Sequence, residues 1–152
     1  MTAAAQPPPA VVAAARAAAA RWGIPASVTL AQWALESGWG RHTPPGSNNP
    51  FGIKARPGDP ASVAATREVV GGADVTVEAR FRAFASLDEA FDDHARLLAL
   101  APVYAPARTR LPDVKAFCAA LAGRYATDPH YGDRLSAVID GSQLERFDSC
   151  TI

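Results

Sequence analysis

The 152-residue sequence has no net charge, few cysteines and no long apolar run. Lysine plus arginine number 15 and aspartate plus glutamate also number 15, so no overall field attracts a polyanion. We therefore expect neither nucleic acid nor a membrane surface as a partner. The least polar stretch, residues 7–20, is mostly alanine and is interrupted by prolines and Arg16, which makes it too short for a membrane-spanning helix.

The same stretch lacks the charged start and the leucine-rich centre of a secretory signal peptide. We expect the chain to be cytoplasmic until a route that needs no recognisable signal exports it.

Metal-binding and redox patterns are also missing. Cys118 and Cys150 permit at most one disulfide, and neither lies in a zinc-binding spacing. Both a disulfide and a buried Cys118 with a free Cys150 remain open. The three histidines, His42, His94 and His130, have no metal-ligand spacing, so we predict no metal site and no cofactor. His94 falls on the apolar side of its helix, where we expect a hydrogen-bonded core residue.

The chain length suits a single compact domain. Three consecutive prolines predict a disordered or extended lead-in over residues 1–9, followed by one domain over residues 10–152. Apolar spacing and capping residues predict several helices: residues 11–22, a helix from Ser27 to Gly38, one from the Ser86 capping box through Leu98 with Leu97 on its apolar face, one over residues 114–121, and one capped by Asp128.

Between these helices the periodicity changes to strict alternation. Val75, Val77 and Phe81 fall on one side of a predicted strand, and Gly71-Gly72 upstream is a hairpin turn signal. The sequence thus predicts an α+β protein, mainly helical, with one small β-hairpin. A two-residue turn places Glu68 opposite Val75, whereas a four-residue turn places it opposite Val77; both put Glu68 on the apolar face.

Glu36, in "ALESGWGR", is the first candidate for chemistry. It falls in the last turn of its predicted helix, where free carbonyl groups disfavour a carboxylate and so raise its pKa. A general acid needs such a raised pKa, particularly where an aromatic residue such as Trp39 adds desolvation. The alternative is an ordinary solvated surface glutamate.

Glu68 is the second candidate. A carboxylate on an apolar strand face either pairs with an arginine such as Arg67 or Arg80, or points into a cleft where it has a use. Two carboxylates from separate lobes are what glycoside hydrolysis requires, because one protonates the glycosidic oxygen and the other acts on water or on the developing positive charge.

Four segments, in this order, resemble the bacterial glucosaminidase family of peptidoglycan hydrolases: "AQWALESGWGR", "NNPFGIKA", "TREVVGG" leading into "ARFRAFASLDEAFDDHARLL", and "GRYATDPHYGDRLSAVI". The resemblance covers about residues 20–140. It implies a lysozyme-like fold in which a helical lobe and a small β-lobe face each other across a saccharide cleft. It also implies cleavage of the β-1,4 bond between N-acetylglucosamine and N-acetylmuramic acid.

The resemblance implies roles for single residues. Glu36 matches the general acid of the family, Glu68 the acidic residue of the β-lobe, and Tyr125 a tyrosine of the cleft needed for activity. It further implies substrate contacts, for which the candidates are Trp39, Asn49, Phe51 and Tyr131. From residue type alone, Tyr125 is more simply a core residue, and the asparagines Asn48 and Asn49 more simply shape their loop.

The sequence leaves two other functions open: a lytic transglycosylase or muramidase on the same fold, and a non-catalytic module that binds the cell wall. We expect a monomer that acts on peptidoglycan glycan strands in the periplasm or cell wall. An exported antibacterial effector, held in check by an immunity protein, is the biological role we favour.

Overall fold

A computed structural model describes residues 4–148 of the chain. Within them the elements are α1 (Pro9–Trp22), α2 (Ala26–Ser37), β1 (Ala61–Val70), β2 (Ala73–Arg82), α3 (Leu87–Leu100), α4 (Ala105–Arg108), α5 (Val114–Leu121) and α6 (Tyr131–Gly141), with 3-10 helices at Pro102–Tyr104 and Leu144–Asp148. The predicted α+β, mainly helical class is confirmed.

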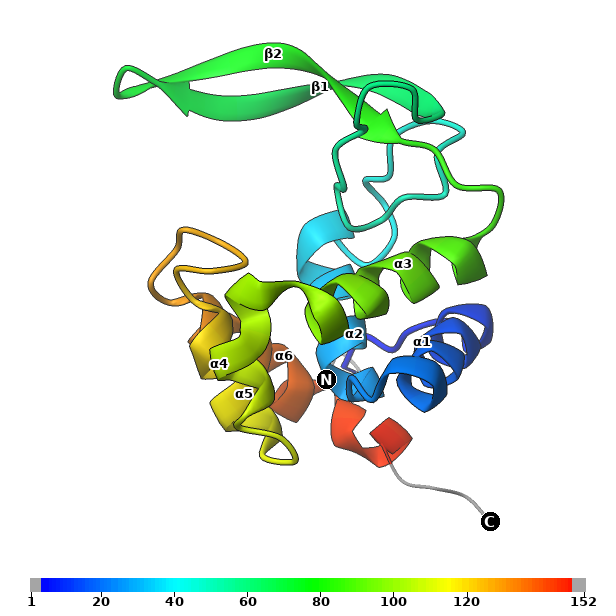
Figure 1. Ribbon diagram of the computed structural model, residues 1–152, viewed down its shortest axis with the longest axis vertical. Helices are drawn as coiled ribbons and strands as arrows, with labels where there is room; N and C mark the ends of the chain where they lie inside the picture. Colours follow the sequence, from blue (N-terminus) through cyan, green and yellow to red (C-terminus); the bar gives the residue numbers. More distant parts are fainter. Residues whose placement is uncertain (1–3, 149–152) are drawn as a thin grey trace.

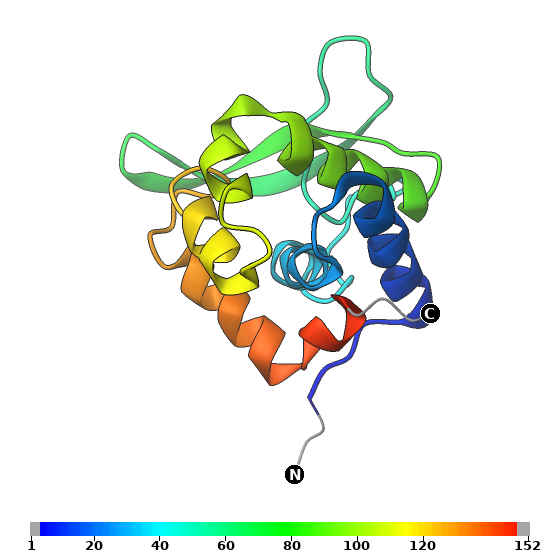
Figure 2. The ribbon, with the colours of Figure 1, turned by 60° about the horizontal axis from the view of Figure 1, so that its bottom comes forward.

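Helix α2 lies at the centre of the helical lobe. All but Leu35 and Glu36 of its residues are buried, and α1, α3, α5 and α6 surround it when it is viewed close to its axis (Figure 2). Most residues of α2 are apolar or small, which suits a helix that is covered by other helices on every side. Its C-terminal end points out of the helical lobe toward the hairpin (Figure 1).

Strands β1 and β2 form the β-lobe, which lies across the open end of the helical lobe (Figure 1). Gly71 and Gly72 form a two-residue turn with φ angles of 59° and 84°, which only a residue without Cβ adopts readily. This turn puts Glu68 opposite Val75, and so confirms the tighter of the two predicted registers. Backbone hydrogen bonds from Ala55 to Arg80 and from Arg82 to Ile53 join the hairpin to the preceding loop.

Several predicted details are wrong. Ser27 does not cap α2: it lies inside the helix, and the carboxylate of Asp148, distant in sequence, accepts a hydrogen bond from its backbone N–H at 2.8 Å. Leu97 is 41% exposed, because the buried stripe of α3 runs through Phe91, His94 and Leu98 instead.

The last long helix begins at Tyr131 rather than beside Asp128. Asp128 accepts a hydrogen bond from the backbone N–H of His130 at 2.8 Å, so it shapes the turn before the helix. It also forms an ion pair with Arg134 at 3.1 Å.

Two expectations concern the ends of the chain. Residues 4–8 of the expected lead-in contain no helix or strand, and Pro7 is buried. Cys118 is buried, and burial raises the pKa of its thiol to about 12. Cys150 lies outside the described residues, and so does any disulfide that it forms.

Candidate active site

The C-terminal end of α2 places Glu36 at the boundary between the two lobes. Gly38 ends the helix in the left-handed conformation, with φ 57°, and the backbone N–H of Trp39 donates to the carbonyl of Ala34 at 3.0 Å. Trp39 also has a positive φ, 62°, and its ring packs edge-on against Trp33 at 5.7 Å between centroids. These constraints fix the direction in which the chain leaves the helix directly after Glu36.

Glu36 is an exposed residue of α2 and lines the cleft, while its carboxylate contacts the aromatic residue Tyr131. Its carboxylate accepts a hydrogen bond from the hydroxyl of Tyr131 at 3.0 Å. Burial raises the pKa of Glu36, while the Tyr131 hydrogen bond and the charge of Arg134 oppose that rise. Burial dominates, so the pKa of Glu36 is shifted in the direction that a general acid needs.

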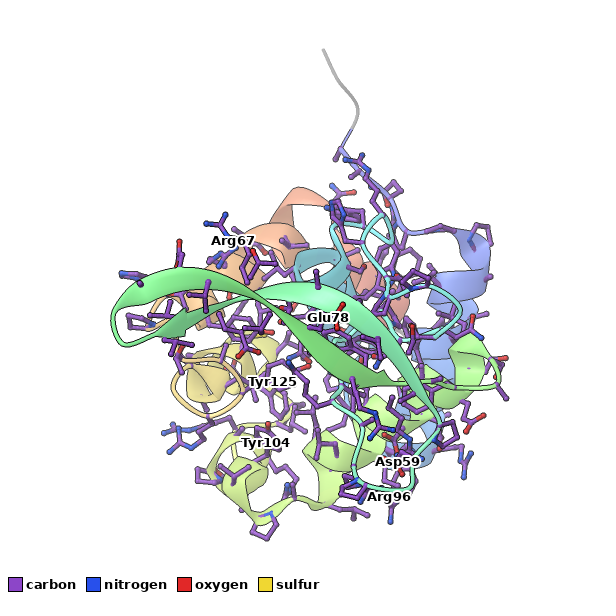
Figure 3. The ribbon with its side chains drawn as sticks, turned by 90° about the horizontal axis from the view of Figure 1, so that it is seen from above. Asp59, Arg67, Glu78, Arg96, Tyr104 and Tyr125 are labelled. Atoms are coloured by element: carbon purple, nitrogen blue, oxygen red, sulfur yellow. The ribbon has the colours of Figure 1, made fainter. Side chains whose placement is uncertain are left out.

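A cluster of aromatic rings lies behind Glu36. Tyr125 stacks on Tyr131 with ring planes 12° apart and centroids at 5.7 Å. On its other side Tyr125 meets the edge of His94, which stacks on Phe51 at 4.0 Å. Seen from above, Tyr125 and Tyr104 lie on the same side of the helical lobe (Figure 3), and their ring centroids are 6.2 Å apart.

Burial, with smaller contributions from Tyr131 and Glu36, raises the pKa of Tyr125 well above its ordinary value. The Tyr125 phenol is therefore neutral at every pH at which the protein works, and it offers one hydrogen-bond donor and an acceptor.

A cleft of about 600 Å³ lies between the lobes, and both candidate carboxylates line it. Its wall consists of the end of α2, the loop after it and strand β1; among its lining residues are Glu36, Arg41, His42, Lys54, Thr66, Glu68 and Phe81. The two residues that the sequence singled out thus come from separate lobes and lie along one cavity.

Glu68 is exposed, with 45% of its side chain accessible, and its partner differs from both arginines considered. Lys54 donates to its Oε1 at 3.1 Å, and the Lys54 ammonium also lies 4.9 Å from the centre of the Phe81 ring. Arg67 pairs with Asp74 instead, at 3.0 Å. Pairing and a position in the cleft, which the sequence presented as alternatives, therefore occur together.

Residues 12–144 match the family described as Glucosaminidase: Mannosyl-glycoprotein endo-beta-N-acetylglucosaminidase. The chain belongs to the glucosaminidase family. Membership makes the protein a glycoside hydrolase, and the cleft between the lobes is the region in which its chemistry is expected.

The chain is similar to relatives named as a probable N-acetylmuramidase, a peptidoglycan hydrolase and an exo-glucosaminidase. It is 36% identical to a probable N-acetylmuramidase of Lactococcus lactis over 85% of this chain and 31% of the relative. It is 37% identical to the peptidoglycan hydrolase FlgJ of Salmonella typhimurium, over 77% and 39%, and 34% identical to the exo-glucosaminidase LytG of Bacillus subtilis, over 80% and 45%. The chain thus spans less than half the length of these relatives.

The chain is also similar in structure to solved peptidoglycan hydrolases and autolysins. A peptidoglycan hydrolase mutant from Sphingomonas sp. A1 superposes with a TM-score of 0.77 at 38% identity, covering 91% of this chain and 94% of that one. The catalytic domain of the autolysin Auto from Listeria monocytogenes gives a TM-score of 0.79 at 28% identity, covering 95% and 90%. The predicted lysozyme-like fold is confirmed.

The residues predicted to bind substrate differ in how exposed their side chains are and in how many of their hydrogen-bonding groups are free. The Asn49 amide is buried and fully used: it donates to the carbonyls of Ile53 and Arg82 and accepts from the backbone N–H groups of Phe51 and Ile53. Its side chain therefore shapes the loop, and its backbone N–H is also used, since it donates to the Ser47 hydroxyl at 3.1 Å.

The other three residues are arranged differently. Phe51 is 4% exposed and packs on Phe91 and His94, so it mainly supports the cleft floor. Tyr131 is also 4% exposed, and its hydroxyl is bonded to Glu36. Half-buried Trp39 is the member of this set with the most ring surface free. Substrate contact by any of these residues stays a prediction.

His94 corrects one expectation. It is fully buried as predicted, but neither ring nitrogen has a hydrogen-bond partner among the described residues. Burial lowers the pKa of His94 to about 3, so the imidazole is neutral.

The absence of a metal ion and of a membrane partner stays a prediction. Residues 4–148 contain no group of three or more side chains that could together hold a metal ion. No helix within the same residues combines the length and the apolar character that crossing a membrane requires.

Two residues of the site were not recognised from the sequence. Gln32 lies one turn before Glu36 and donates to Tyr131 at 3.1 Å; the spacing of four residues on one helix was the available signal. Lys54 pairs with Glu68 only because the loop and hairpin fold together, and no local pattern indicates such a contact.

Proposed function

We propose that this glucosaminidase hydrolyses the β-1,4 bond between N-acetylglucosamine and N-acetylmuramic acid in peptidoglycan glycan strands. The observation that carries the proposal is the cleft, in which Glu36 from the helical lobe and Glu68 from the hairpin line one cavity. The names of relatives, among them a peptidoglycan hydrolase and an exo-glucosaminidase, support the choice of substrate.

In this proposal Glu36 is the general acid. Burial raises the pKa of Glu36, which favours the protonated form that donates to the glycosidic oxygen as this oxygen gains negative charge during bond cleavage. After the transfer the Tyr131 hydroxyl stabilises the carboxylate by donating to it.

Glu68 acts from the other side of the cleft, on the positive charge that develops at the sugar or on the attacking water. Its ion pair with Lys54 holds the carboxylate on the cleft face of the hairpin. Tyr125, a neutral phenol beside Tyr131, orients the substrate or its acetamido group.

A muramidase is the second candidate, because one of the relatives bears the name probable N-acetylmuramidase. Analysis of products separates the possibilities. Purified peptidoglycan is digested, reduced with borohydride and examined by mass spectrometry. We expect reduced N-acetylglucosamine at the new ends. Reduced N-acetylmuramic acid indicates a muramidase, a 1,6-anhydro end indicates a lytic transglycosylase, and intact strands indicate a binding module; each of these contradicts the proposal.

The biological setting follows from the substrate. Because peptidoglycan lies outside the cytoplasmic membrane, we place the action of the chain in the periplasm or cell wall after export. The effector role, the monomeric state and the immunity protein stay predictions. Purification of the chain from its native host, followed by identification of bound proteins, tests for an inhibitor.

A further inference from the structure

Gln32 connects to Glu36 through a two-step hydrogen-bond chain. Its amide nitrogen donates to the Tyr131 hydroxyl at 3.1 Å, and that hydroxyl donates to Glu36 at 3.0 Å. Gln32 is 0% exposed and Tyr131 is 4% exposed, so water does not compete at the inner end of this chain. We propose that Gln32 is a positioning residue that holds the hydroxyl proton of Tyr131 on Glu36. This inference rests on the proposed role of Glu36.

The chemistry of the groups gives the chain its direction. An amide nitrogen can only donate, and a phenol has a single proton. Once Gln32 occupies a lone pair of the Tyr131 oxygen, the Tyr131 proton is directed away from Gln32 and toward Glu36. Donation from Gln32 also polarises the phenol, which strengthens its bond to a carboxylate.

The amide oxygen of Gln32 indicates that this residue lowers the stability of the folded protein. Its oxygen is buried and has no hydrogen-bond partner among the described residues. A buried polar atom without a partner destabilises the folded protein, and an apolar residue at this place in α2 would avoid that penalty. The hydrogen bond from the amide nitrogen to Tyr131 therefore explains why a glutamine, and not an apolar residue, occupies position 32.

Other titratable groups surround Glu36 and stay unchanged when Gln32 is replaced. Arg134 of α6 and Tyr125 act on Glu36 or on its neighbours, and Tyr104 and Cys118 lie behind the tyrosines. Charged and titratable groups that line the cleft are Arg41, His42, Lys54, Arg67 and Glu68. We call the hydrogen-bond chain from Gln32 through Tyr131 to Glu36 the relay. Differences in the pKa of Glu36 between variants of Gln32 and Tyr131 therefore report the relay itself.

The test is a titration of the Glu36 carboxyl carbon by NMR in the full chain, without substrate. Replacing Tyr131 by Phe removes a bond that favours the ionised form, so we expect the pKa of Glu36 to rise by about one unit. Gln32→Met should raise it by roughly half as much, because the phenol keeps its contact but loses its fixed direction. The double variant should match Tyr131→Phe alone, since Gln32 acts only through Tyr131.

Thr29→Val is the matched control, because Thr29 lies on the same helix, is 0% exposed and has a hydroxyl that finds no partner within residues 4–148. It should leave the pKa of Glu36 unchanged. The proposal is overturned if Gln32→Met leaves the pKa unchanged or lowers it, if its full effect persists beside Tyr131→Phe, or if Thr29→Val produces the same shift.

Circular dichroism checks the fold of each variant, and Gln32→Leu replaces Gln32→Met if the latter is unfolded. Should neither fold, Tyr131→Phe alone must raise the pKa of Glu36, and the absence of a rise refutes the relay. Because this titration needs no peptidoglycan, a failure of the proposed hydrolysis and a failure of the relay are separate results. Where hydrolysis is observed, the basic limb of the pH profile should move upward in the same order of variants.

Discussion

Acid should destabilise this protein through His94. The imidazole is fully buried, makes no hydrogen bond within residues 4–148, and has its pKa lowered by burial from 6.5 to about 3. In the unfolded chain the same group takes up a proton near pH 6.5. Protonation therefore favours unfolding, so the stability that neutral His94 provides is complete above pH 6.5 and is lost as the pH falls toward 3.

The size of the effect follows from the two pKa values. Between pH 6 and pH 3.5 the free energy of unfolding should fall by about 1.4 kcal/mol per pH unit from this residue. At pH 4.5 the accumulated loss is about 3 kcal/mol, which is a large part of the roughly 5–15 kcal/mol that stabilises a typical domain.

Urea unfolding at pH 7 and at pH 4.5 measures this loss in wild type and in His94→Leu. Leucine has a similar volume and no titratable group, so the variant should lose about 3 kcal/mol less than wild type between the two pH values. At pH 7 the two proteins should be similar, because removing two unpartnered nitrogens offsets the loss of stacking on Phe51.

His130→Gln serves as the control, because the His130 side chain is 77% exposed. It should behave like wild type at both pH values. An equal loss of stability in wild type and in His94→Leu would refute the reasoning.

Two further predictions concern Gly40 and Lys54. Gly40 has φ 88°, and an added Cβ would lie 3.2 Å from Trp33; Gly40→Ala should therefore lower the free energy of unfolding by about 1–2 kcal/mol. Gly58→Ala, with φ 89° and open space, should cost less in the same urea experiment, and equal costs would exclude the Trp33 contact as a cause. Lys54→Met should lower kcat/KM on peptidoglycan by about fivefold, because Glu68 loses its partner. In a Glu68→Gln background the Lys54 substitution should have no further effect, and an undiminished effect there would contradict the pairing.

Local patterns predicted much of the fold. The glycine pair predicted the turn of the hairpin and the strand face of Glu68, although it left two registers open, and Gly38 was correctly predicted to end α2. Both predictions succeeded because turns and helix ends depend on the backbone conformations that a few adjacent residues allow. The resemblance to a family supplied the remainder, namely that the two lobes face each other.

Contacts between distant residues could not be predicted in this way. The cap on α2 comes from Asp148, more than a hundred residues away, and the partner of Glu68 comes from a loop without regular structure. His94 was placed correctly in the core by its helical spacing. Its missing hydrogen bonds depend on which rings pack around it, and a single sequence does not determine that.

The central claim is that Glu36 supplies the proton in the cleft. The most direct measurement compares Glu36→Gln with Glu78→Gln in the digestion of purified peptidoglycan. Glu78 lies on strand β2 of the same hairpin (Figure 3) and is not among the residues that line the cleft, so it is a matched control. We predict that Glu36→Gln lowers kcat by about a hundredfold or more with the fold intact, and that Glu78→Gln digests at the wild-type rate. Digestion by Glu36→Gln at the wild-type rate would contradict the account.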